Sequence, residues 1–191
     1  IGYPALAATE ADFYPVQIMN YRLGGGSFAS QLTQQLREGK GYTYGINSSF
    51  NGAANHGVFI ISSGVRSNVT FESVSLIKDI VAQYGTNFTA HDLIVTKGYL
   101  IKSNARAFET LESKLEMLYD ISNYNYADDY AKQQENIVKN STIGAIKKLS
   151  ETYLNADKMI YLVVGDAETQ LKKLDEIGFG APILLNKSAV K

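Results

Sequence analysis

The segment from residue 24 to residue 50 constrains the fold more than any other part of the chain. Three consecutive glycines open it, apolar residues follow at steps of four, two further glycines come next, and an alternating run ends it. The apolar residues are Phe28, Leu32 and Leu36, the later glycines are Gly39 and Gly41, and the alternating run extends from Tyr42 to Phe50. Steps of four are typical of one helix face, and a period of two is typical of a strand. The segment therefore predicts a helix with Ser27 as its N-cap, then a turn and a strand.

The neighbouring segments extend this unit in both directions. Apolar residues at helical spacing predict a helix over residues 10–21, and Gly24 to Gly26 would end it as a glycine C-cap with positive φ. A second alternating run predicts a strand over residues 58–65 that pairs antiparallel with the first.

The second half of the chain is mostly helical in its pattern. Thr89 and Asp92 resemble a capping box at the start of a helix, and Gly85 would close the helix before it. Further apolar stripes occur at Leu111, Leu115 and Leu118, at Tyr126, Tyr130 and Ile137, and at Ile143, Ile146, Leu149 and Tyr153. Residues 159–164 are apolar on both faces and predict a strand buried within a sheet. Residues 166–177 predict a short helix, and residues 183–185 predict a last strand. Strands, then helices, then strands predict an α+β layered sandwich: a mostly antiparallel sheet with helices packed on one side.

Composition excludes several classes of function. The 191 residues fit one domain spanning 1–191. A net charge of −1 offers no basic field for nucleic acid, and no apolar run approaches the length needed for membrane insertion. There is no cysteine, and neither His56 nor His91 starts a metal-binding motif. The chain begins without methionine in a predicted strand, so we expect a piece excised from a longer precursor.

The segment 24–50 resembles the zinc-free domain of the pitrilysin/insulinase family of zinc metallopeptidases. Family members carry L-G-G-G-x-F-x-S-R-L, then L-R-E-x-x-G, then a tyrosine on the next strand. The resemblance extends to the opening Gly2 to Ala5 and to the late Val163 to Asp166. It implies the mitochondrial-processing-peptidase-like fold. The zinc domain of the family carries His-x-x-Glu-His, which this chain lacks.

The resemblance also implies partners and site residues. We expect no zinc in this chain, a cognate zinc-bearing domain in the same chain or in a separate subunit, and a peptide substrate enclosed between the two. Arg37 and Tyr44 have the spacing of the arginine and tyrosine that reach the substrate in the family. A bacterial periplasm or cell envelope is compatible with the resemblance.

Three alternatives stay open at this stage. Arg37 could serve as a helix-end cation for the last carbonyls, and Tyr44 could pack beside Tyr42, Ile46 and Phe50. The glycine run before a helix could cradle a phosphate, although no Walker lysine follows it. The whole chain could be a structural subunit of the respiratory-complex core-protein type, which shares the fold without proteolysis.

Overall fold

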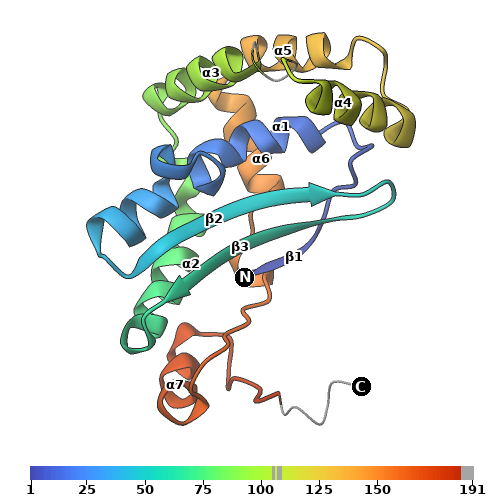
Figure 1. Ribbon diagram of the computed structural model, residues 1–191. Helices are drawn as coiled ribbons and strands as arrows, with labels where there is room; N and C mark the ends of the chain where they lie inside the picture. Colours follow the sequence, from blue (N-terminus) through green and yellow to red (C-terminus); the bar gives the residue numbers. More distant parts are fainter. Residues whose placement is uncertain (105, 107–108, 186–191) are drawn as a thin grey trace.

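The computed structural model describes residues 1–104, 106 and 109–185, and a three-stranded antiparallel sheet lies at its centre (Figure 1). The strands are β1 (Gly2–Ala5), β2 (Thr43–Gly52) and β3 (Gly57–Val65), in the spatial order β1-β3-β2. Phe59 of β3 pairs with Tyr3 on one side and with Phe50 on the other. The predicted antiparallel pair of strands is confirmed, and the opening residues add a third strand.

The longer helices follow the predicted order along the chain. They are α1 (Phe13–Asn20), α2 (Thr70–Asn87), α3 (Ala90–Asn104), α4 (Leu111–Tyr124), α5 (Tyr130–Asn140), α6 (Ile143–Tyr153) and α7 (Ala167–Leu174). Short helical turns lie between them: η1 (Tyr21–Gly25), η2 (Ser27–Ala29), η3 (Thr33–Gly39), η4 (Ser67–Val69), η5 (Ala156–Lys158) and η6 (Asp175–Ile177). None of the helices in the described ranges is both long and apolar enough to cross a membrane.

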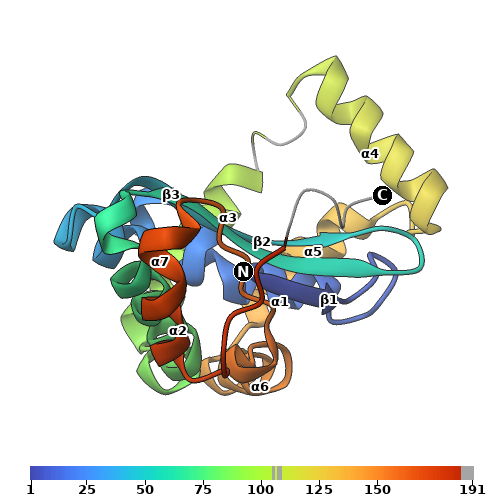
Figure 2. The ribbon, with the colours of Figure 1, turned by 90° about the horizontal axis from the view of Figure 1, so that it is seen from below.

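The sheet is covered on one face and open on the other. Burial alternates along β3, where Phe59 and Ile61 are buried and Val58 and Ile60 are exposed, as period-two geometry requires. Figure 2 shows α1, α2 and α6 on one side of the sheet, and the buried side chains meet them in one core. The observed architecture is the predicted α+β arrangement.

One helix boundary within the core differs from the sequence prediction. The helix α2 does not end at Gly85 but continues to Asn87. A Cβ on Gly85 would lie 2.1 Å from Ser150 Oγ on α6. Gly85 therefore allows two helices to approach closely inside the core, and it does not stop a helix.

The predictions for the C-terminal part fail more often. The α4 residues Leu111, Leu115 and Leu118 are exposed rather than packed, and Figure 2 shows α4 standing away from the helices that cover the sheet. Residues 159–164 form one isolated bridge, between Ile160 and Gly2, and residues 183–185 form no strand. Ile160, Leu162 and Val164 are exposed, so the prediction of a strand buried on both faces is wrong.

Candidate functional site

The glycine run owes its composition to close packing. Helix α1 passes directly into the wider turn η1, and none of Gly24 to Gly26 has a positive φ. A Cβ on Gly24 would lie 2.3 Å from Ser48 Oγ and 2.6 Å from Ser48 N, and one on Gly26 would lie 2.6 Å from Tyr21 O. The predicted glycine C-cap is therefore wrong. Gly24 lets the end of the helix lie directly against β2, and Gly26 lets the chain turn closely against Tyr21.

The helix that carries Arg37 is capped by Ser30 and not by Ser27. The Ser30 hydroxyl accepts a hydrogen bond from Thr33 N at 3.3 Å, and Ser30 has the extended φ and ψ of an N-cap. Ser27 instead has a φ of 49° inside the preceding turn. The buried Thr33 hydroxyl donates to Ile46 O at 3.3 Å, which ties this helix to β2.

The Arg37 guanidinium lies on the surface above an aromatic ring. Its central carbon is 4.7 Å from the centroid of the Phe28 ring, and its Nε is 3.4 Å from Glu38 Oε1. Phe28, predicted to belong to the buried stripe with Leu32 and Leu36, is 57% exposed, whereas those two leucines are fully buried. An arginine over a ring face gains a cation–π attraction, and part of the Arg37 side chain still reaches solvent.

The helix-end carbonyls do not require the Arg37 side chain. The carbonyls of Gln35, Leu36 and Arg37 already accept backbone N–H groups of Lys40, Tyr42 and Gly41, at 3.1, 2.9 and 3.0 Å. Gly41 makes this turn with a φ of +62°. The role of Arg37 as a helix-end cation is therefore not supported, because backbone donors satisfy those acceptors.

Tyr44 lies in a β-bulge that turns it away from the core. Thr43 pairs with Val65 and Ile46 pairs with Ser63, so Tyr44 and Gly45 together stand opposite Gly64. The Thr43 hydroxyl accepts from Gly45 N at 3.0 Å and donates to Gly64 O at 2.7 Å, which fixes the bulge.

The bulge changes the side of the sheet on which Tyr44 lies. The Tyr44 side chain is 95% exposed, whereas Ile46 and Phe50 are buried. The packing alternative for Tyr44 is therefore wrong. Simple alternation along the strand predicted that alternative because it did not account for the extra residue, and the one signal for it in the sequence is Gly45 directly after the tyrosine.

A partly buried ion pair, which the sequence pattern does not reveal, fixes the turn that carries Phe28. Arg22 Nε donates to Asp92 Oδ1 at 2.8 Å, and the Arg22 guanidinium also donates to the Ala29 carbonyl. Asp92 Oδ2 accepts Thr89 N and Thr89 Oγ1 at 2.8 and 2.7 Å, so the predicted capping box is confirmed. Burial raises the pKa of the Asp92 carboxyl, but hydrogen bonds from Thr89 and Arg22 outweigh that effect and lower the pKa below its usual value.

Metal-ligating side chains do not converge in the described part of the chain. No group of three or more histidine, cysteine, aspartate or glutamate residues there could hold a metal ion. His56 and His91 are both exposed; His56 lies in the loop between β2 and β3, and His91 lies in α3. The arrangement around Arg37 and Tyr44 can therefore supply a cation and a phenol at a surface, but it offers no metal ligand set.

Comparison with known proteins identifies relatives of this chain. The family described as "Peptidase M16 inactive domain" matches residues 1–98. An uncharacterized zinc protease from Streptomyces coelicolor is 32% identical over 88 residues, which is 44% of this chain and 19% of the relative. The chain therefore spans about a fifth of that relative's length.

Solved structures extend the likeness beyond the matched segment. A peptidase M16 inactive domain from Pseudomonas fluorescens superposes with a TM-score of 0.77 at 26% identity, covering 83% of this chain and 38% of that chain. A chain of complex III from Candida albicans superposes with a TM-score of 0.65 at 6% identity, covering 79% of this chain and 38% of that chain, and at this identity it shares the fold alone.

Proposed function

Because the chain belongs to the peptidase M16 inactive-domain family, we propose that it forms the zinc-free domain of a zinc peptidase and binds part of the peptide substrate through Arg37 and Tyr44. The single observation that carries this proposal is the exposure of Tyr44. Simple alternation along β2 would place this tyrosine, the second residue of the strand, on the core side, yet a hydrogen-bonded bulge leaves it 95% exposed. A phenol in that position is free to donate to a ligand.

Arg37 suits a second contact with the same ligand. A peptide carbonyl under attack develops negative charge, and both a phenol and a guanidinium donate hydrogen bonds to such an oxygen. Zinc held by the partner domain would activate the attacking water. The residues of this chain would bind and orient the peptide, and the Phe28 ring restricts where the guanidinium can lie.

If the partner domain holds the zinc and this chain binds the peptide, two expectations follow for metal binding and for activity. We expect the purified chain, after dialysis against micromolar zinc, to retain no stoichiometric metal and to cleave no peptide, because it has neither a ligand set nor a general base. We also expect its cognate zinc-bearing domain to associate with it and to need it for full activity. One tightly held zinc per chain, or full activity of the zinc domain alone, would contradict the proposal.

The second candidate is a structural subunit without a peptide site. It is supported by the fold that the chain shares with a component of Candida albicans complex III. Under this alternative, the full-length protein would assemble normally but would cleave no peptide with zinc present, and Arg37→Ala would change nothing that can be measured. Peptide cleavage that depends on Arg37 favours the first candidate.

A further inference from the structure

The open face of the sheet carries no charged side chain in its described strands. Apart from Tyr44, the exposed positions along β2 and β3 bear only aliphatic, glycine, serine and asparagine residues. Five of these exposed residues are Asn47, Asn51, Val58, Ile60 and Ser62. Charged residues are mostly found at exposed positions, so a sheet face without any charged side chain is unusual for a surface that meets only water.

Aliphatic side chains extend this face beyond the three strands. Ile60 pairs with Gly2, and Gly2 pairs on its other side with Ile160, through hydrogen bonds of 3.0 and 2.9 Å. Directly opposed residues of antiparallel neighbours point to the same face, so Ile60 and Ile160 flank Gly2 on the open side. Ile60 is 41% and Ile160 is 69% exposed.

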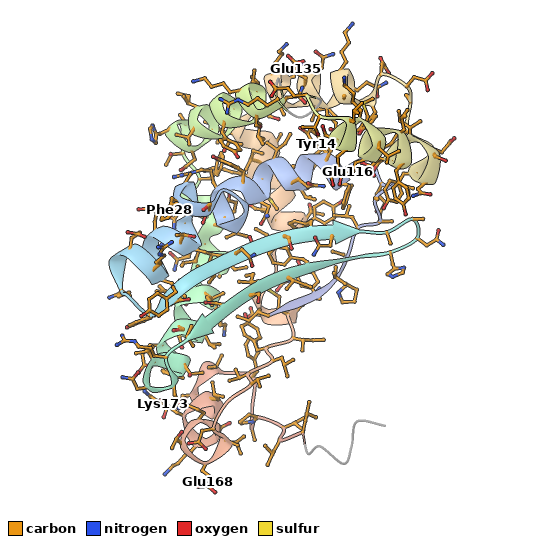
Figure 3. The ribbon with its side chains drawn as sticks, in the orientation of Figure 1. Tyr14, Phe28, Glu116, Glu135, Glu168 and Lys173 are labelled. Atoms are coloured by element: carbon orange, nitrogen blue, oxygen red, sulfur yellow. The ribbon has the colours of Figure 1, made fainter. Side chains whose placement is uncertain are left out.

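Tyr44 belongs to the same face. Thr43 and Ile46 on either side of the bulge are both buried toward the helices, so Tyr44 and Gly45 occupy the opposite side, across from the exposed Gly64. A Cβ on Gly45 or on Gly64 would meet no atom within 4 Å, so the surface beside the phenol is clear. The phenol and the aliphatic row therefore lie at two ends of one uncharged face. In Figure 3, the strands β2 and β3 that form this face lie in front of the helices α2 and α6.

We propose that this open face binds the substrate chain next to Tyr44 and that it selects peptide segments with uncharged, partly aliphatic side chains. The inference rests on the proposed function of Tyr44. Alternate side chains of an extended peptide would lie on the face, apolar ones against Ile60 and Ile160, and polar ones against Asn47 and Ser62. A charged side chain placed there would lose water without gaining an opposite charge, which is costly.

The test introduces one charge into the face of the full-length protein that carries this chain. Ser62 is exposed in the middle of β3, so Ser62→Lys should leave the fold intact. Cleavage of matched peptides that differ by one alanine, aspartate or lysine measures the preference. We expect the unaltered protein to favour the alanine peptide over both charged peptides by about tenfold or more in kcat/KM. Ser62→Lys should raise kcat/KM for the aspartate peptide about two- to fivefold and lower it for the lysine peptide.

A matched control separates a local effect from a change in net charge. Ala82→Lys places the same charge on an exposed position of α2, on the far side of the sheet, and should leave all three rates unchanged. Equal effects of the two variants, or an unaltered protein that prefers a charged peptide, would overturn the inference. A Ser62→Lys protein that loses its association with the zinc domain and keeps its peptide preference would also overturn it, because the face would then be a domain interface.

One further variant distinguishes failure of this inference from failure of the proposed function. If Tyr44→Phe slows cleavage while Ser62→Lys leaves the preference unaltered, Tyr44 contacts the peptide but the open face does not select it. If neither variant affects cleavage, both the proposed function and the inference are wrong.

Discussion

Residues 1–98 and residues 99–185 carry similar apolar patterns but bury them to very different extents. In the first region, the stripe of α2 is buried at Val74, Ile77 and Val81. In the second region, the stripe of α4 is exposed, and so are most apolar residues after residue 158 that the structure describes. The comparison teaches that a periodic stripe identifies the apolar face of a helix but does not identify what covers that face.

The largest expected difference between the two regions concerns leucine truncation. Leu36 is fully buried beside β2, and Leu115 on α4 is 67% exposed. Leu36→Ala should lower the free energy of unfolding by about 2–5 kcal/mol, because it removes packed atoms and leaves a cavity. Leu115→Ala should change it by less than about 0.5 kcal/mol. Urea denaturation of both variants measures the difference, and equal losses would mean that α4 packs against something in solution.

A second prediction concerns the partly buried Arg22–Asp92 pair, which lies within the first region. Asp92→Ala should lower the free energy of unfolding by up to about 3 kcal/mol, because it leaves the partly buried Arg22 guanidinium without its charged partner. The lowered pKa of Asp92 gives the pair a pH dependence. Its contribution is complete above the pKa of an unfolded aspartate, about 4, and is lost as the pH falls through the lower pKa of the folded state.

Measurements of stability at acidic pH test the direction of this pH dependence. The unaltered protein should lose more stability than Asp92→Ala as the pH falls from about 5 to about 2. Arg66→Ala, which changes an exposed arginine at the end of β3, is a control for the loss of a charge. Parallel acid limbs for the unaltered protein and Asp92→Ala would rule out the pair as their source.

The smallest expected change in stability concerns substitutions of two glycines, one closely packed and one with open space around it. Gly24→Ala should lower the free energy of unfolding by about 1–3 kcal/mol, because the new methyl would overlap Ser48. Gly98 lies in α3 with open space around it, so Gly98→Ala should stabilise by about 0.5–1 kcal/mol through helix propensity. Thermal midpoints of the two variants should move in opposite directions, and a neutral Gly24→Ala would mean that α1 and β2 are further apart in solution.

These contrasts indicate how much of the fold the sequence could predict. Local signals succeeded where the interaction is itself local, as at the capping box of Thr89 and Asp92 and along β3. They failed where a contact spans the chain. Gly24 is required by Ser48 and Gly85 by Ser150, and neither partner can be inferred from spacing.

The candidate site was also predictable from the sequence only in part. Arg37 and Tyr44 were found through resemblance to a family motif, and alternation alone would have buried Tyr44. Only the paired registers of Thr43 and Ile46 reveal the bulge, because one extra residue reverses the side of the sheet on which a side chain lies. Phe28 was assigned to a buried stripe, although its ring is on the surface under Arg37. The apolar residues 159–164 predict a buried strand, but a single bridge to Gly2 does not bury them.

The most direct test of the account is the kinetic effect of Tyr44→Phe in the full-length protein, measured together with the thermal midpoint of the same preparation. If the phenol donates to the developing oxyanion, kcat should fall by about a hundredfold, or about 3 kcal/mol. The midpoint should not change, because the side chain is 95% exposed. Tyr119→Phe, at another exposed tyrosine on α4, should alter neither quantity. A Tyr44→Phe protein with unchanged kcat would contradict the central claim that this zinc-free domain takes part in binding the reacting peptide.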